Sequence, residues 1–268
     1  MKYSIGDVSQ VLNLSREMIR YYEKNGVLKL TRDSSSNYRN YEIMDIFWLM
    51  ESLQYRSWGV SIPEIQKIRE DSFHIQTAGF LEKQTESLDQ EILKKTMLKE
   101  RLSEVVINMR QSFYNLDNVW IRYIPPYYSF HLVNGRGDSY DQINVDPKIR
   151  EIYFAGDIIG FLDNGIIWHE ESQEWVMQMD EKYVRALDLP VLPGMSYEEG
   201  GLYICSNADI GDIGSFDTHA PDRIRAYAET KQIICSNKIR GVLIGRGKVN
   251  DRFRRIVEFR MRIQDEKS

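Results

Sequence analysis

The N-terminal sequence is organised around a short charged and aromatic segment, which reads Ser15-Arg16-Glu17-Met18-Ile19-Arg20-Tyr21-Tyr22-Glu23-Lys24. Ser15 is a typical helix N-cap residue, and Asn25-Gly26 ends the segment because glycine adopts the left-handed C-cap conformation at low cost. Ser4 begins an earlier helix, whose apolar face is formed by Ile5, Val8, Val11 and Leu12. Asn13-Leu14 leaves only a short turn between them, so the spacing predicts a helix-turn-helix.

Two arginines give the second helix its chemistry. Arg16 and Arg20 are four residues apart, which places both on one helix face. The guanidinium fork matches guanine edges and phosphate oxygens, and the hydroxyl groups of Tyr21 and Tyr22 can also reach phosphates. This pattern favours a helix that enters the major groove of DNA. The alternative is a plain three-helix bundle with solvated arginines.

A polar stretch at residues 31–41 ends in Asn37-Tyr38-Arg39-Asn40-Tyr41 and predicts a small β-wing. It places Arg39 between Tyr38 and Tyr41, which repeats the arginine and tyrosine chemistry of the second helix. Helical periodicity returns after it, and Ser61 with Glu64 begins a further helix. We therefore expect a winged helix-turn-helix DNA-binding domain over residues 1–75. Acidic and basic residues are equal in number there, so the basic ones must be sorted onto one face.

Residues 76–115 predict one long helix, because no proline occurs there and no glycine follows Gly79. From Leu98 the apolar spacing is 4, 3, 4, through Leu102, Val105 and Met109, which is typical of a coiled-coil seam. The simplest partner for this seam is the same helix of a second copy. We therefore expect a homodimer.

The remaining chain, residues 119–268, alternates apolar stretches with one helical stretch from Asp217 to Lys231. The expected strands lie at 120–133, 157–163, 174–179, 200–205, 241–245 and 256–263. Strands interrupted by helices predict an α+β domain.

Composition excludes several classes of protein. Over 268 residues there is no apolar run long enough for a transmembrane helix, and no signal-peptide core follows Met1, so we expect a cytoplasmic protein. The two cysteines, Cys205 and Cys235, are too few for a disulfide framework and too isolated for a zinc or iron–sulfur site. We expect no metal and no cofactor. The net charge of −5 argues against bulk nonspecific binding of nucleic acid.

Five blocks resemble the MerR family of transcription regulators. They are Tyr3-Ser4-Ile5-Gly6-Asp7-Val8, the Arg-Tyr-Tyr-Glu run at 20–23, Gly26-Val27-Leu28, Tyr38-Arg39-Asn40-Tyr41 and the Gly-Val-Ser-Ile run at 59–62 with Glu64-Ile65. The blocks occur in family order and cover about residues 1–70. The resemblance implies an antiparallel coiled-coil dimer and DNA contacts at Arg16, Arg20, Tyr21, Tyr22 and Arg39, with a phosphate contact at Arg56. The wing departs from the family pattern at Asn37 and Asn40.

The C-terminal region resembles the GyrI-like ligand-binding domain of multidrug-sensing MerR regulators. The resemblance rests on Glu199-Gly200-Gly201-Leu202-Tyr203 as a strand entry, the helix from Asp217 and a closing strand at 257–263. It implies a repeated βαββ fold with a ligand between the halves, and an effector that is a lipophilic cation or drug.

A pocket for such a cation needs aromatic faces and a carboxylate. The candidate aromatic residues are Trp120, Tyr123, Tyr127, Phe154, Phe161, Trp168, Trp175 and Tyr203. The strand at 239–245 lacks the acid that the resemblance implies, so the candidate carboxylates are Glu170, Glu171, Glu198 and Glu258. The alternatives are ordinary core aromatics and surface carboxylates in salt bridges.

The sequence as a whole favours a dimeric regulator without enzymatic activity. The resemblance implies promoter DNA and RNA polymerase holoenzyme as partners, with effector binding bending and untwisting an over-long promoter spacer. Two alternatives stay open. The C-terminal domain could be a DNA-tethered small-molecule hydrolase with Glu258 or Glu170 as general acid or base, or it could only recruit another protein.

Overall fold

The computed structural model describes residues 2–28, 30, 40–70, 75–112, 114–170, 172–249 and 251–264. The chain divides into two compact units, residues 1–93 and 94–268. The division falls inside one long helix, and each unit is described here by itself. Among the described residues, no helix has both the length and the apolar character needed to span a bilayer.

The N-terminal unit is helical. Its elements are α1 (Ile5–Leu12), α2 (Arg16–Lys24), α3 (Ile43–Ser57), α4 (Ile62–Glu70) and the beginning of α5 (Ile75–Ser112). Ser4 and Asp7 form the expected capping box, and the Met18 amide donates to Ser15 Oγ at 3.1 Å. The predicted helix-turn-helix is therefore present, with the cap residues that the sequence indicated.

One apolar core holds these helices together. Val8 from α1, Ile19 and Tyr22 from α2, and Leu49 from α3 are buried in it. Val11 differs from the prediction, since it is exposed and lies outside the core. Of the wing predicted at residues 31–41, residues 31–39 lie outside the described residues, and Tyr41 pairs with Tyr3 in an antiparallel bridge.

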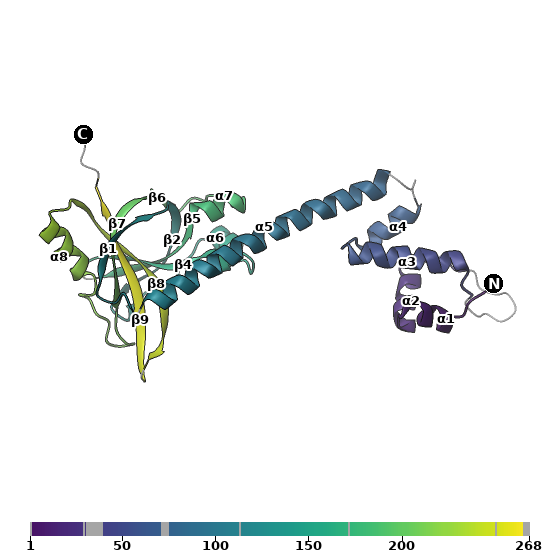
Figure 1. Ribbon diagram of the computed structural model, residues 1–268, viewed down its shortest axis with the longest axis horizontal. Coiled ribbons are helices and arrows are strands. Elements are labelled where there is room, and N and C mark those ends of the chain that lie inside the picture. The colour runs from purple at the N-terminus through teal and green to yellow at the C-terminus, as the bar shows by residue number, and fades with distance from the viewer. Residues whose placement is uncertain are drawn as a thin grey trace. The chain divides into compact units, whose positions relative to one another are not determined.

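The second half of α5 packs onto the C-terminal unit. Figure 1 shows this half of α5 lying along the sheet. Met97, Arg101 and Ser112 in this half are buried, Met97 in the C-terminal core, Arg101 against Asp163 of β4 and Ser112 against Asn207 of β7. The seam predicted from Leu98 is therefore divided between two faces. Leu98 packs against the C-terminal core and Val105 lines a cavity, whereas Leu102 and Met109 stay exposed.

The C-terminal unit is an antiparallel sheet with short helices at its ends. Its elements are β1 (Val119–Ile124), β2 (Tyr127–Arg136), β3 (Ser139–Tyr140), α6 (Pro147–Tyr153), η1 (Ile159–Phe161), β4 (Asp163–Trp168), β5 (Gln173–Asp180), α7 (Glu181–Ala186), β6 (Met195–Glu198), β7 (Gly201–Asp209), α8 (Asp222–Lys231), β8 (Cys235–Val249) and β9 (Arg252–Ile263).

The strand order is β1-β7-β9-β8-β4-β5-β2-β3, and β6 pairs with β2. Two β-α-β-β sequences share this sheet, namely β2-α6-β4-β5 and β7-α8-β8-β9. They meet at the β4–β8 pair. Figure 1 shows α8 at one end of the sheet and α6 with α7 at the other. The α+β class and the repeated βαββ order are therefore confirmed.

The strand that precedes each repeat pairs with the other repeat. β1 leads into β2 but pairs with β7, and β6 leads into β7 but pairs with β2. The two connections pass close to each other at Gly200. A Cβ atom there would lie 2.9 Å from Pro126 Cδ and 3.1 Å from the Ile124 carbonyl oxygen, and it would also meet the Tyr123 hydroxyl. Only glycine fits this crossing without displacing backbone.

Three predicted element boundaries were wrong. The stretch at 120–133 is two strands, because Pro125-Pro126 supplies no backbone N–H groups to a ladder. The stretch at 157–163 is mostly the turn η1, and the strand begins at Asp163. The helix expected from Asp217 begins at Asp222, because Asp217 Oδ1 accepts from the His219 amide in a local turn instead.

The crossing at Gly200 yields a stability prediction. We expect Gly200→Ala to lower the free energy of unfolding of the C-terminal unit by about 1–3 kcal/mol, because the added methyl group overpacks two backbone connections. Chemical denaturation followed by circular dichroism measures the effect. Gly247→Ala is the matched control, since a Cβ there meets nothing within 4 Å. Equal stability of the two variants would contradict the close approach.

Candidate functional site

The exposed face of α2 is the first candidate site. Arg16 and Arg20 are both exposed, and they flank Ile19, which is buried in the core and fixes the rotation of the helix. Tyr21 is 50% exposed and packs edge-on against Tyr22, with ring centroids 6.0 Å apart. The buried face of α2 is therefore held by the core, and the opposite face exposes two guanidinium groups and one phenol.

Lys24 extends this face. It is exposed and lies four residues after Arg20, in the last turn of α2. The sequence reasoning did not single it out, although its i+8 spacing from Arg16 was a usable signal.

One predicted DNA contact belongs to the core instead. Tyr41 has no exposed surface; its hydroxyl donates to Glu23, and its backbone pairs with Tyr3. An enclosed side chain with an engaged hydroxyl offers no accessible donor to a phosphate, so the prediction for Tyr41 is corrected. The ring of Tyr22 also packs in the apolar cluster, and its DNA contact stays a prediction.

Of the remaining predicted DNA contacts, one lies in the described residues and two do not. Arg56 is exposed, but its Nη1 donates to the Val60 carbonyl at 2.8 Å and so also secures the end of α3. Tyr38 and Arg39 lie outside the described residues, so their DNA contacts stay a prediction.

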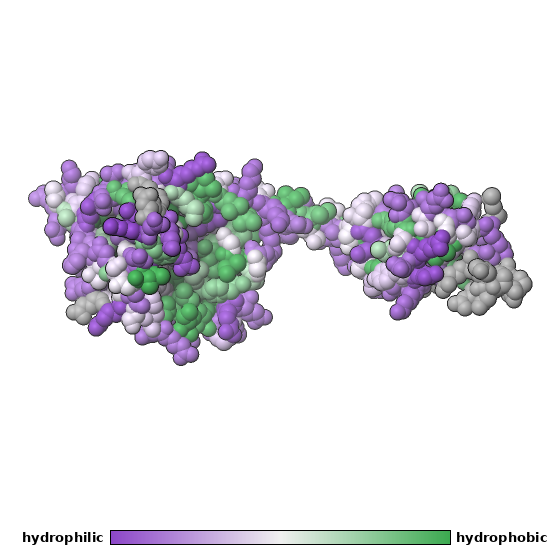
Figure 2. Space-filling model, turned by 90° about the horizontal axis from the view of Figure 1, so that it is seen from below, coloured by the Kyte–Doolittle hydropathy of each residue, from purple (hydrophilic) through white to green (hydrophobic). Residues whose placement is uncertain are grey.

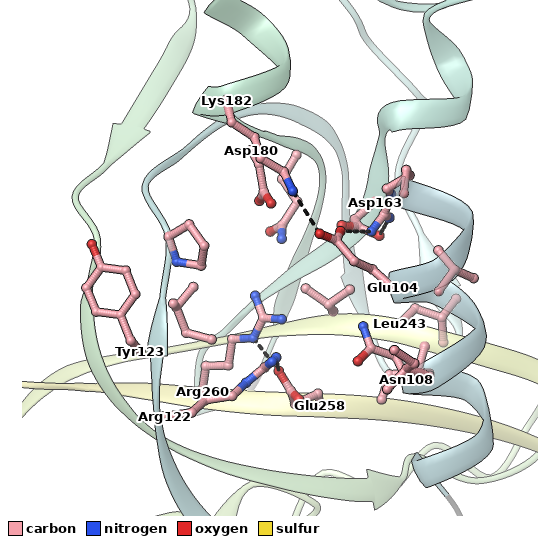
Figure 3. Close-up of a pocket in the computed structure, with 18 residues that line it drawn as sticks. Glu104, Asn108, Arg122, Tyr123, Asp163, Asp180, Lys182, Leu243, Glu258 and Arg260 are labelled. Atoms are coloured by element: carbon pink, nitrogen blue, oxygen red, sulfur yellow. Dashed lines mark hydrogen bonds and ion pairs between the residues drawn. The ribbon is translucent and has the colours of Figure 1, made fainter. Parts of the chain in front are cut away.

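The second candidate site is a cavity of about 390 Å³ in the C-terminal unit, between the second half of α5 and one face of the sheet (Figure 3). Residues of α5, β1, β4, β5, β8 and β9 line it. Its basic lining residues are Arg101, Arg122, Lys182 and Arg260, and its acidic lining residues are Glu104, Asp163, Asp180 and Glu258. Its volume is within the usual range for small-molecule sites.

Most of these charges are paired. Arg101 from α5 is buried and forms an ion pair with Asp163, and Lys182 Nζ lies 2.7 Å from Glu104 Oε1. Both pairs join α5 to strands or helices of the sheet domain. They therefore hold α5 against the cavity and neutralise that wall.

Glu258 is buried between two arginines. Its Oε1 accepts from Arg260 Nε at 2.6 Å and from Arg122. Burial raises the pKa of Glu258, but the charges and hydrogen bonds of Arg260 and Arg122 outweigh burial and hold that pKa below its ordinary value. The carboxylate is therefore ionised at neutral pH and already compensated.

Asp180 differs from the other acids. In the described chain, its side-chain oxygens accept no hydrogen bond and form no ion pair, and its carboxyl group lines the cavity (Figure 3). Burial and the neighbouring charge of Asp163 raise its pKa, against the opposing effects of Arg260 and Lys182. Asp180 is thus a desolvated acid that faces the cavity without a close partner.

The predicted aromatic residues do not surround one cavity. Phe154 and Phe161 pack in the cluster beside α6 and α7, Trp168 and Trp175 in the cluster under α8, and Trp120, Tyr127 and Tyr203 around Cys205. Trp168 stacks on Phe216 with centroids 5.4 Å apart. Of the twelve candidate ligand-binding residues, Glu258 and Tyr123 are, within the described chain, the two that line the 390 Å³ cavity.

The other candidate carboxylates lie elsewhere. Glu170 and Trp168 border a shallower depression beside α8. Glu198 forms an ion pair with Arg240. Glu171 lies outside the described residues.

Neither cysteine has the features of a reactive group. Burial raises the pKa of the Cys205 thiol to about 11, and burial also raises the pKa of Cys235. Both are therefore protonated at neutral pH. Within the described ranges, no group of three or more His, Cys, Asp or Glu side chains is arranged to hold a metal ion.

The sequence reasoning missed Arg122, Arg260 and Asp180. A signal for Arg260 was present, because Glu258, Arg260 and Arg262 alternate with apolar residues and so share one face of β9. Asp180 and Arg122 had no such signal, since each lies at or near the end of a strand where polar residues are common.

Comparison with known proteins finds a family that the N-terminal unit matches. The model of the MerR HTH family regulatory protein matches residues 3–72. The HTH-type transcriptional regulator HmrR of Sinorhizobium medicae (strain WSM419) is 34% identical over 65 residues, which cover 24% of this chain and 44% of HmrR. The N-terminal region is therefore a MerR-type helix-turn-helix, and the chain matches less than half the length of this curated relative.

Several solved structures are similar at lower identity. EcmrR, in the cryo-EM structure of the EcmrR-DNA complex in EcmrR-RPo, is 14% identical with a TM-score of 0.37; the match covers 98% of this chain and 100% of EcmrR. A MerR family regulator from Bacillus cereus is 23% identical with a TM-score of 0.35, over 41% of this chain and 84% of that chain. HiNmlR, a MerR family regulator lacking the sensor domain and bound to promoter DNA, is 23% identical with a TM-score of 0.31, over 42% and 90%.

The arginine-enclosed carboxylate yields a prediction. We expect Glu258→Gln to lower the free energy of unfolding by about 3–5 kcal/mol at neutral pH, because it leaves Arg260 buried without its counterion. Because the pKa of Glu258 is lowered in the fold, this contribution is present above the ordinary carboxyl pKa and is lost as pH falls toward the lowered one.

Urea denaturation at several pH values measures both effects. Glu199→Gln is the control, since Glu199 is exposed and pairs with Arg262 at the surface, where a salt bridge contributes at most about 1 kcal/mol. A difference between wild type and Glu258→Gln that does not shrink on acidification would contradict the assignment.

Proposed function

We propose that this protein is a DNA-binding transcription regulator that acts at promoters in the cytoplasm. The observation that carries the proposal is the exposed face of α2. There the second helix of a MerR-type helix-turn-helix presents Arg16, Arg20 and Tyr21 around the buried anchor Ile19. Lys24 would extend the contact to a neighbouring phosphate.

We further propose that the regulator is a homodimer through α5. Leu102 is 56% exposed, and Val106 and Met109 are exposed at spacings of 4 and 3 residues along the same face. Leu88 and Ile92, earlier on the helix, are exposed as well. Figure 2 shows that hydrophobic residues gather in patches on one face of the C-terminal unit. An apolar stripe of this kind is best covered by a matching helix.

The cavity is the proposed effector site. Arg101, Glu104 and Asn108 of α5 line it, so a ligand that rearranges their contacts also acts on the dimerisation helix. An effector shifts the equilibrium only if it binds the activating conformation more tightly than the resting one. RNA polymerase holoenzyme is the proposed partner, with bending and untwisting of an over-long promoter spacer as the activating step.

The lipophilic cation implied by the GyrI-like resemblance has little support in this cavity. Glu258 is neutralised by two arginines, and although Asp180 has no ion pair, the single aromatic residue in the described lining is Tyr123. The hydrolase alternative named Glu258 or Glu170 as general acid or base, and neither fits the role of general acid, because that role needs a raised pKa whereas that of Glu258 is lowered and Glu170 is exposed.

DNA binding is tested first by selecting duplexes from a random library with the full-length protein and sequencing them. Arg16→Ala and Arg20→Ala are each expected to weaken binding to a selected duplex by about 1–3 kcal/mol per half-site and to reduce its salt dependence. Arg185→Ala, an exposed arginine of the C-terminal unit, is the control and should bind as wild type. Unchanged binding by the α2 variants would contradict the proposed surface.

The dimer is tested by sedimentation velocity. We expect Leu102→Glu to shift the protein from dimer to monomer at micromolar concentration, because a charge in the apolar stripe must be desolvated on both sides of the interface. Gln111→Glu, exposed on the same helix but outside the stripe, should leave the dimer intact. A wild-type monomer would refute this proposal directly.

A further inference from the structure

The cavity contains an arginine whose hydrogen-bonding capacity is only partly used. Arg260 is 13% exposed, and within the described chain its guanidinium forms one hydrogen bond, from Nε to Glu258. In Figure 3 the end of Arg260 extends upward from β9 into the cavity, beyond the Glu258 contact. A desolvated guanidinium favours an acceptor, and a planar carboxylate matches its two terminal nitrogens.

Arg122 adds to this positive wall. It contributes a second guanidinium against the single carboxylate of Glu258, so the Arg122–Glu258–Arg260 group carries a net charge of about +1 at neutral pH, given ordinary arginine ionisation. Its Nε is buried without a hydrogen-bond partner. The cavity therefore has an excess of positive charge on the side of β1 and β9.

Asp180 supplies the opposite charge on another wall. It lies at the end of β5, and in Figure 3 its carboxyl group points into the cavity from above while Arg260 enters from below. The adjacent Lys182 forms its ion pair with Glu104 and, within the described residues, none with Asp180. The pairs Arg101–Asp163 and Lys182–Glu104 balance the rest of the lining.

We propose that the cavity binds a small zwitterionic molecule, with a carboxylate held by Arg260 and Arg122 and an ammonium group held by Asp180. Such a ligand provides a counterion to the arginines and another to Asp180, and it adds no net charge to the cavity. A cation or an anion alone would provide a counterion to one of the two walls only. The inference rests on the proposed function to the extent that this cavity is the effector site.

The test is isothermal titration calorimetry of the full-length protein with ω-amino carboxylates from 4-aminobutanoate to 8-aminooctanoate. Hexanoate and hexylamine serve as probes with one charge, and tetraphenylphosphonium as the lipophilic cation. We expect at least one amino carboxylate to bind ten or more times more tightly than either single-charge probe. No binding by the series, or tighter binding of tetraphenylphosphonium, would overturn the proposal.

A variant separates the two walls. Asp180→Asn should weaken binding of the best amino carboxylate at least tenfold and leave the affinity for hexanoate unchanged, because only the ammonium contact is lost. Asp188→Asn, at an exposed turn outside the cavity, is the matched control and should bind as wild type. Equal loss for both probes would mean a folding defect or a different site, and either result counts against the assignment of Asp180.

Duplex binding by the same preparations keeps this result separate from the proposed function. If the amino carboxylates fail while the selected duplex is bound through Arg16 and Arg20, the zwitterion proposal is wrong and the regulator proposal stands. If duplex binding fails while an amino carboxylate binds, the regulator proposal is wrong and the zwitterion proposal stands.

Discussion

The C-terminal unit depends on how charged groups are buried between α5 and the sheet. Arg101 lies on the inner face of the helix, where an unpaired guanidinium would cost several kcal/mol, and Asp163 at the start of β4 supplies the counterion. Lys182 and Glu104 form a second connection one turn further along. Because these contacts require specific partners, they fix the rotation of α5 about its axis far more strictly than apolar packing would.

This rotation gives the two faces of α5 different roles. One face carries Met97 and Arg101 onto the sheet domain and lines the cavity with Glu104 and Asn108. The other leaves Leu102 and Met109 free for a partner. A helix that continues into the N-terminal unit thus lines the proposed ligand site along its second half. This is the kind of element through which an effector can act at a distance, provided its two states differ in free energy.

Local signals in the sequence predicted local structure well. Ser4, Asp7 and Ser15 define helix starts because a cap is formed by residues within one turn, and the four-residue spacing of Arg16 and Arg20 is sufficient to place both outward. The burial of Tyr22 and Tyr41 was missed because a tyrosine beside arginines has the same local sequence whether its ring faces DNA or the core. Their burial is decided by how the helices of the N-terminal unit pack into one cluster, which the local sequence does not show.

The ligand site was less predictable for a related reason. A count of aromatic residues suggested one cage, but alternate residues of a strand point to opposite faces, so the aromatics were divided among three cores. Glu258 was found as a buried carboxylate, yet its chemistry is set by Arg260 on the same strand together with Arg122, which is 136 positions away in the chain. Pairing across a sheet determines whether a buried acid attracts a cation, and pairing is not visible from a single strand.

The exchange of β1 and β6 between the two repeats has a consequence for how this domain can change over evolutionary time. The strand that precedes each β-α-β-β repeat in the chain pairs with the other repeat, and the two connections cross at Gly200. Deleting either repeat together with its preceding strand would remove a paired strand from the other repeat. The sheet edge exposed in this way could then pair with other chains and cause aggregation. We therefore expect the two repeats to be retained together in evolution rather than separately, because neither keeps its paired edge without the other.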